Sequence, residues 1–173
     1  MTRKGLTVAA SIVVLISSLG LVIARVANRK EVSPLRLNIS TLYDVDYNVS
    51  HIPLKVTFEN TSEGDVRILQ AFKDPAVLPV FFRFGITASD GTPIATRGGG
   101  KVTLSPESYQ YAVLKRGQKL EVIADVARVL PDGVKLKEGT YHFNLVYQNQ
   151  YGADCFKGRV ESNIIEVRLA DTN

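Results

Sequence analysis

Side chains suited to catalysis or metal binding are scarce in this chain of 173 residues, which has two histidines and one cysteine. His51, His142 and Cys155 are far apart in the sequence, and they lack the paired ligand spacing of a zinc site. A Ser-His-Asp or Cys-His arrangement is compatible with the composition, but no Gly-x-Ser-x-Gly or comparable signature accompanies it. We therefore expect no catalytic residue, no cofactor, no metal ion and no enzymatic activity.

Three weaker candidate sites come from oxygen ligands, glycines and aromatic rings. Asp44, Asp46 and Asn48 could bind Ca²⁺, but they lack the Gly and distal Glu of a dedicated calcium loop, which favours a solvated connector. Gly98, Gly99 and Gly100 form a flexible loop by our interpretation, because no Lys-Ser/Thr or helical pattern follows them. Four aromatics are candidates for an exposed binding surface, although such residues are more often core: Phe81, Tyr109, Tyr111 and Tyr151.

Beyond residue 34 the chain alternates apolar and polar residues in short runs separated by turn residues, which predicts strands. The expected strands are 35–40, 52–59, 66–72, 80–89, 109–114, 119–129, 140–148 and 160–169. Residues 92–96 form a short segment after a hairpin, and residues 102–104 are a candidate for a short edge strand. The apolar face of these runs predicts one core containing Leu54, Val56, Phe58, Phe82, Phe84, Leu120, Val122, Phe143, Leu145 and Val167. With 41–50 and 73–79 as loops and no helix, this predicts an all-β antiparallel sandwich of seven or eight strands.

Several of these runs resemble the strands of bacterial exported immunoglobulin-like domains. The run LKVTFENTSEGDVRI, Leu54–Ile68, resembles their second strand, turn and third strand, and Phe84–Gly91 resembles their next hairpin. Glu138–Phe143 resembles the Gly-x-Tyr-x-Phe opening of their penultimate strand, and Phe156–Gly158 with Glu161–Asn163 resembles a Trp-x-Gly…Ser-Asn ending, with Phe156 in place of Trp. The layout is also similar to the intracellular proteinase inhibitor family. The resemblance implies an immunoglobulin-like fold across about residues 35–170, but no inhibitory loop can be placed residue by residue.

One tyrosine has a structural role by the same comparison. Tyr141 follows Gly139 at the start of a strand and resembles the tyrosine corner, in which a phenol bonds to backbone at the end of the sandwich. We predict that its hydroxyl is hydrogen-bonded rather than pointing into solvent.

The segment Leu6–Ala24 has 19 residues without a charge, which as a helix would be roughly 28 Å long, close to the hydrocarbon thickness of a bilayer. Arg3 and Lys4 precede it and Arg25 follows it, which is typical of a single membrane-spanning anchor. The alternative is a cleaved signal peptide, for which Val22–Ala24 offers a site, although the apolar stretch exceeds the usual signal core. Residues 1–30 are thus an anchor or signal peptide, and residues 31–173 a single domain.

Charge and compartment indicate what the domain does. Residues 31–173 carry 16 Lys+Arg against 17 Asp+Glu, a net charge of −1, which is no electrostatic footprint for nucleic acid. A lone Cys155 forms no intramolecular disulfide, and the Asn38, Asn48 and Asn60 sequons matter only in a eukaryotic source, whereas we favour a bacterial one.

We therefore predict a single-pass membrane protein that is anchored through Leu6–Ala24. Its immunoglobulin-like domain would lie on the periplasmic or cell-surface side and bind a protein partner, without a small-molecule substrate. The alternative is a secreted or periplasmic inhibitor-like binding protein released by signal-peptide cleavage.

Overall fold

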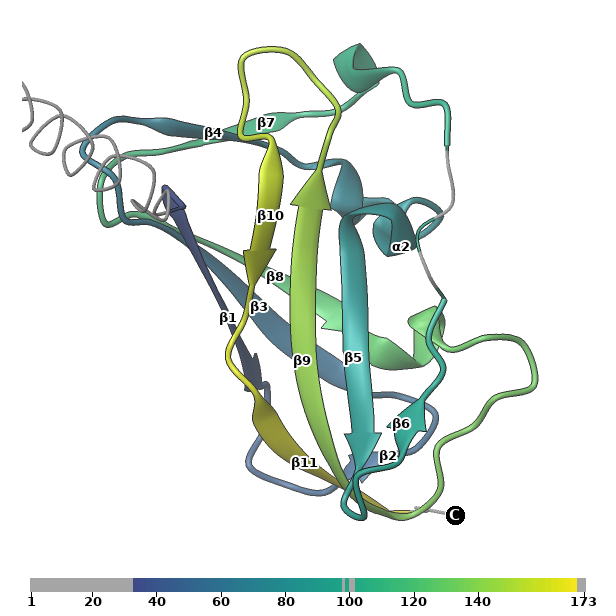
Figure 1. Ribbon diagram of the computed structural model, residues 1–173. Coiled ribbons are helices and arrows are strands. Elements are labelled where there is room, and N and C mark those ends of the chain that lie inside the picture. The colour runs from purple at the N-terminus through teal and green to yellow at the C-terminus, as the bar shows by residue number, and fades with distance from the viewer. Residues whose placement is uncertain (1–32, 98, 100–101, 171–173) are drawn as a thin grey trace, which may run out of the picture. The chain divides into compact units, whose positions relative to one another are not determined.

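The computed structural model describes residues 33–97, 99 and 102–170, and strands make up most of their regular structure (Figure 1). The strands are β1 Leu35–Thr41, β2 Tyr47–Asn48, β3 Pro53–Asn60, β4 Val66–Leu69, β5 Phe82–Ala88, β6 Pro93–Ile94, β7 Tyr111–Leu114, β8 Lys119–Asp125, β9 Gly139–Asn149, β10 Gly158–Glu161 and β11 Ile165–Ala170. Short helical segments join some of them: η1 Ala71–Lys73, α2 Leu78–Phe81, η2 Pro106–Ser108 and η3 Val126–Val129. The prediction of an all-β fold is confirmed, whereas the expectation of no helix is wrong.

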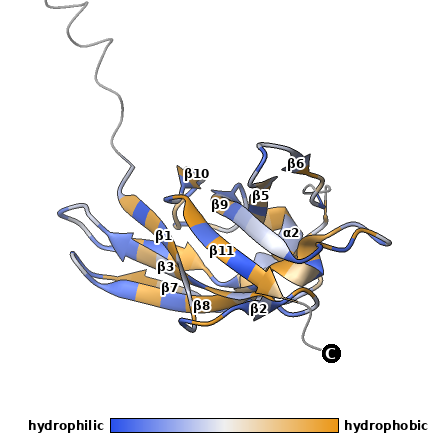
Figure 2. Ribbon diagram, turned by 90° about the horizontal axis from the view of Figure 1, so that it is seen from below, coloured by the Kyte–Doolittle hydropathy of each residue, from blue (hydrophilic) through white to orange (hydrophobic). Residues whose placement is uncertain are grey.

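The strands form two main sheets. One has the order β1-β3-β8, and the other has the order β2-β11-β9-β5-β6 with β10 also paired to β9. A separate pair, β4-β7, extends beyond the first sheet, and all described pairings are antiparallel except that of β2 with β11. Seen from below, β1, β3, β7 and β8 make one layer, and β5, β9 and β11 lie in the layer above them (Figure 2).

Aromatic rings from both layers meet in the core. Phe58 of β3 lies 4.9 Å from Tyr147 of β9, edge to face, and 6.1 Å from Phe82 of β5. Phe72 of η1 stacks 5.2 Å from Phe82. Rings of this size dominate the apolar area that a core removes from water, so these contacts hold the two sheets together.

The alternating pattern predicts most of the core correctly. Eight of the ten expected core residues are buried, whereas Leu120 and Val122 are only partly buried. Both lie on β8, the last strand of its sheet, with no strand of the described residues beside its outer edge. The two residues whose burial was predicted wrongly therefore lie in the edge strand of the sheet.

Several expected strands are shorter or interrupted. The strand expected at 66–72 ends at Leu69 before η1, and the strand expected at 119–129 ends at Asp125 before η3. The strand expected at 160–169 is two strands, β10 and β11, separated at residues 162–164. The Asp125 carboxylate accepts a hydrogen bond from Ala127 N at 3.1 Å, which begins the turn of η3 and which alternation alone does not reveal.

Three further assignments also change. Val80 belongs to α2, not to a strand, because Pro79 occupies an early position of that helix, where a missing N–H costs nothing. Tyr47 and Asn48, expected in a polar connector, form β2, while residues 102–104 are not a strand. The Asp90-Gly91 hairpin is confirmed between β5 and β6, with Gly91 at φ +86°.

The tyrosine-corner prediction is confirmed. Tyr141 Oη donates to Lys137 O at 3.1 Å and accepts from Lys137 N at 3.2 Å. Tyr47 makes an equivalent arrangement that the sequence pattern did not reveal, because its hydroxyl accepts from the backbone N–H groups of Leu42 and Tyr43 at 2.6 and 2.8 Å. Each phenol fixes the loop that precedes its strand.

The Asn60 sequon is a structural element. Asn60 is buried, and its Nδ2 donates to Gly64 O and Leu114 O, both at 2.7 Å. Its Oδ1 accepts from Ser62 N at 2.9 Å. The nitrogen that a glycan would need is thus occupied inside the fold.

No helix in the described part of the chain is long and apolar enough to cross a membrane. The predicted anchor, Leu6–Ala24, lies outside the described residues, as do Gly98 and Gly100.

Candidate functional site

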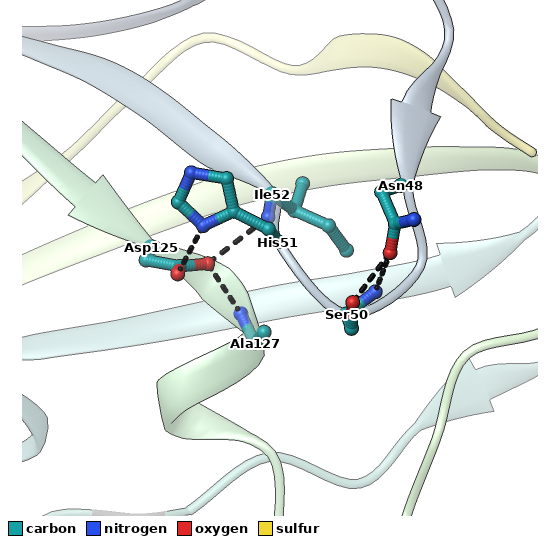
Figure 3. A network of polar contacts seen from close by, with 6 residues as sticks. All are labelled: Asn48, Ser50, His51, Ile52, Asp125 and Ala127. Carbon is teal, nitrogen blue, oxygen red and sulfur yellow. Dashed lines mark hydrogen bonds and ion pairs between the residues drawn. The ribbon is translucent and has the colours of Figure 1, made fainter. Parts of the chain in front are cut away.

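A histidine and a carboxylate that are distant in sequence meet at one end of the β3–β8 pair (Figure 3). His51 Nδ1 lies 2.8 Å from Asp125 Oδ2. The other carboxylate oxygen accepts from the backbone N–H groups of Ile52, at 3.0 Å, and Ala127, at 3.1 Å. Asp125 is therefore fixed from three directions, and it orients a His51 ring whose side chain is 68% exposed.

Local structure explains this meeting. Asp125 is the last residue of β8 and stands opposite Pro53, the first residue of β3, so the preceding turn is brought beside it. In that turn Asn48 Oδ1 accepts from Ser50 N at 2.8 Å, and Asn48 O accepts from His51 N at 3.0 Å. The turn directs His51 toward the end of β8.

A groove of about 450 Å³ begins at this pair and follows β8. Its apolar surface comes from Phe72, Leu78, Phe82 and the half-exposed Val122. Phe72 belongs to η1, where the sequence predicted the end of a strand, and Leu78 belongs to α2, where it predicted a loop, so sequence alternation did not anticipate this wall of the groove.

The acidic and basic side chains at the rim of the groove differ in whether they form ion pairs. The acidic residues are already engaged, because Asp125 holds His51 and Glu121 Oε1 lies 3.7 Å from Lys55 Nζ. Lys73 and Arg128, both exposed, form no ion pair with any described residue. The rim thus has unneutralised positive charge suited to an anionic group.

The chemistry available at the groove is binding with an oriented imidazole. An aspartate-held histidine can move protons, and in hydrolases it does so beside a nucleophile. Within the described residues no hydroxyl or thiol hydrogen-bonds to His51, and the groove wall opposite is apolar.

The other residues singled out for metal or thiol chemistry lie elsewhere. His142 is on the exposed face of β9, as predicted, with Nε2 3.6 Å from Glu166 Oε2. Cys155 is half-buried in the β9–β10 loop, where Sγ donates to Tyr151 O at 3.3 Å. His51, His142 and Cys155 have no contact partner in common, so the described structure does not bring them together.

The candidate calcium ligands are used otherwise. Asp46 Oδ2 lies 3.5 Å from Arg168 Nε, and Asn48 Oδ1 shapes the turn at Ser50. Among the described residues, no group of three or more His, Cys, Asp or Glu side chains is placed to hold a metal ion.

The aromatic candidates for an exposed surface are largely packed. Phe81 is 1% exposed and belongs to the core, which is the alternative that the sequence analysis favoured for these aromatics. Tyr109, Tyr111 and Tyr151 are half-buried, and the Arg67 guanidinium lies 3.8 Å above the Tyr111 ring.

A second hollow, of about 900 Å³, lies between the 48–50 turn and the 130–138 loop. It is lined mostly by loop residues, including Leu130, Val134 and Leu136, and the only strand residue in its lining is Asn48 of the two-residue strand β2. The groove along β8 is therefore the better candidate for a binding site.

Comparisons with known proteins give little beyond this geometry. No family model matches the chain, and no curated protein matches it. Among solved structures, BslA, a bacterial hydrophobin, is similar at 13% identity and a TM-score of 0.33, over 81% of this chain and 98% of BslA. The Bacillus subtilis protein ycdA, provisionally named a lipoprotein, is similar at 14% identity and a TM-score of 0.28, over 79% of this chain but 34% of that protein. At TM-scores this low, neither similarity is evidence for a function of this chain.

Proposed function

We propose that this chain is a membrane-anchored, extracytoplasmic, immunoglobulin-like module that binds a protein partner and is not an enzyme. The observation that supports binding is the β8 groove, which combines an apolar wall, a charged rim and an adjoining strand edge. Protein recognition commonly uses such a combination, since a strand edge supplies backbone hydrogen bonds and a groove supplies specificity.

The immunoglobulin-like part of the proposal is supported by the strand order. In immunoglobulin-type sandwiches, strands A, B, E and D form one sheet and C, F and G the other. Here β1-β3-β8 corresponds to A-B-E, and β11-β9-β5 corresponds to G-F-C. The position of strand D, beside β8, has no strand among the described residues, and the groove lies there.

The location is supported by the sequence. The uncharged segment Leu6–Ala24 is long enough to span a bilayer, and the net charge of −1 on residues 31–173 suits a domain that works through contact. Release by signal-peptide cleavage, which would give a soluble inhibitor-like protein, is the competing outcome.

Protease protection tests this location. Protease added to intact spheroplasts should reach residues 31–173, and the same protease added to inverted membrane vesicles should leave them whole. Mass measurement of the membrane-bound protein should give an intact N-terminal segment. A mature chain that starts near Arg25 would instead indicate a signal peptide, and cleavage only in inverted vesicles would place the domain in the cytoplasm.

A further inference from the structure

The hydrogen bonds at the two ends of the β3–β8 pair show which backbone groups of β8 are free. At one end Asn60 N donates to Gln118 O at 3.1 Å, and at the other Val126 N donates to Ile52 O at 3.0 Å. In an antiparallel pair, opposite residues exchange such bonds at every second position. The even-numbered residues of β8 therefore bond to β3, and the odd-numbered residues direct their N–H and C=O groups away from it.

The free edge of β8 consequently presents the backbone of Glu121 and Ile123. No described strand pairs with this edge, and no described backbone group hydrogen-bonds to either residue there. The side chain of Ile123 is 62% exposed on the outer face of the same strand.

At the opposite edge of that sheet, formed by β1, backbone groups are hydrogen-bonded to a side chain. Asn163 Nδ2 donates to Ile39 O of β1 at 3.0 Å, and Ile39 N donates to Asn163 Oδ1 at 2.8 Å. A side chain thus occupies the backbone groups of β1 that a further strand would use, which is one way in which proteins protect an edge. The described residues provide no comparable protection along β8.

The groove gives an added strand a place for its side chains. The groove is lined by Glu121, Val122 and Ile123 of β8 and by Phe72 and Leu78 of η1 and α2. A strand paired with β8 would lie about 4.8 Å from it and direct alternate side chains to opposite faces of the sheet. One set of side chains would meet the apolar wall, and the other set would point outward, past the rim of the groove.

The charges at the rim of the groove indicate which side chains an added strand would carry. Lys73 and Arg128 have no acidic partner among the described residues, whereas Glu121 and Asp125 are already paired. A carboxylate at the rim would gain two charge-assisted contacts.

We infer that β8 is a receptor strand to which an extended segment of a partner protein is added. The segment alternates apolar residues, which enter the groove, with acidic residues, which reach Lys73 and Arg128. This inference rests on the proposed protein-binding function and names the surface and the chemistry of its ligand.

A proline substitution at the free edge of β8 tests whether the partner binds by strand addition. The probe is a seven-residue peptide, matching β8 in length, that alternates valine with aspartate and is blocked at both ends. Its binding to the full chain in detergent is measured by fluorescence anisotropy. Ile123→Pro removes a donor that faces away from β3, a position where an edge strand tolerates proline, and Ile123→Thr is the control that keeps it.

We expect Ile123→Pro to weaken binding by about tenfold or more, as for the loss of one or two backbone hydrogen bonds, and Ile123→Thr to leave it within about twofold. A peptide with lysine in place of aspartate should bind more weakly than the original, and Lys73→Glu with Arg128→Glu should reverse that order. If Ile123→Pro lowers the thermal midpoint, the wild-type chain is tested with a peptide N-methylated at alternate amides, which should bind about tenfold more weakly. A peptide that fails to bind, or that binds equally in all these forms, overturns strand addition.

Photo-crosslinking in the native cell separates this inference from the proposed function. Ile123 or, as a control, the exposed Val113 of β7 is replaced by p-benzoylphenylalanine in the full chain. A crosslink from position 123 to an extended, acidic segment of another protein supports the inference. Crosslinks to another protein from position 113 alone overturn the inference and leave the proposed function standing. Crosslinks joining two copies of this chain overturn a separate partner, and the lack of any protein crosslink overturns both proposals.

Discussion

Strand β9 carries a buried tyrosine near each end, and the two hydroxyl groups are in opposite situations. Tyr141 Oη makes two hydrogen bonds to the backbone of Lys137. Tyr147 Oη is buried, and no described residue hydrogen-bonds to it. Tyrosine therefore contributes through its hydrogen-bonded hydroxyl at one end of β9 and through the packing of its ring at the other.

The surroundings explain the difference. Tyr141 contacts one other ring, Phe143, and its hydroxyl reaches the loop that precedes β9. Tyr147 is surrounded by phenylalanine rings, including Phe58 at 4.9 Å and Phe82 at 5.9 Å. Packing at the Tyr147 end outweighs the cost of one unpaired hydroxyl, because aromatic contacts add to a large buried area.

The largest expected effect comes from removing a ring at the Tyr147 end. Phe58→Ala should lower the free energy of unfolding by about 3–5 kcal/mol, because it leaves a cavity at the centre of the aromatic contacts. Phe143→Ala is the matched control, since Phe143 is equally buried but among the described aromatic rings it contacts only that of Tyr141. Urea denaturation should give the larger loss for Phe58→Ala. Equal losses would mean that the ring contacts add nothing beyond burial.

Removing the unpaired hydroxyl should have the opposite sign. Tyr147→Phe should raise the free energy of unfolding by about 1 kcal/mol or more, because a buried hydroxyl without a partner costs about 1–3 kcal/mol. The variant keeps the ring and its packing. Thermal and urea unfolding check the sign, and a loss of stability would indicate that the hydroxyl is bonded after all.

Removing the paired hydroxyl should be destabilising. Tyr141→Phe breaks the two contacts with Lys137 and should cost about 1 kcal/mol, as for a typical lost hydrogen bond. Hydrogen exchange should locate the loss in the loop before β9. A neutral effect would contradict the tyrosine-corner role, and Tyr47→Phe offers a second test in the loop before β2.

Much of this fold could be predicted from the sequence, because it follows from residue patterns within single strands. Alternation places the inward faces of β1, β3, β5 and β9 correctly, because a half-buried strand must present every second residue to the core. It fails at Phe81, which continues the apolar run before β5 but lies in α2, and at the break between β10 and β11. Those features depend on contacts with other elements.

The candidate site could not be predicted in this way, because it combines residues that are distant in the sequence. His51 and Asp125 are 74 residues apart, and only the β3–β8 register brings them together. The one available signal was the position of Asp125 at the end of an alternating run, where aspartate often begins a helical turn. The groove lies along an edge of β8 with which no strand of the described residues pairs, and no pattern within β8 could reveal that.

The smallest expected effect is the response of the Tyr147 end to alkaline pH. Burial, and secondarily the nearby Cys155 thiol, raises the pKa of Tyr147 well above its ordinary value. The folded protein therefore keeps the proton at a pH where the unfolded chain releases it. The stability associated with this group is fully present below the unfolded pKa of about 10 and is lost as the pH rises above it.

Between pH 8 and pH 10.5 this linkage should lower the free energy of unfolding by about 0.8 kcal/mol. Other groups also titrate in this range, so the quantity to measure is the difference between wild type and Tyr147→Phe, from urea denaturation at each pH. That difference should change across the range, with wild type losing more stability. Parallel curves for wild type and Tyr147→Phe would show that the Tyr147 hydroxyl ionises as easily in the folded protein as in the unfolded chain, and that its end of β9 is open to water.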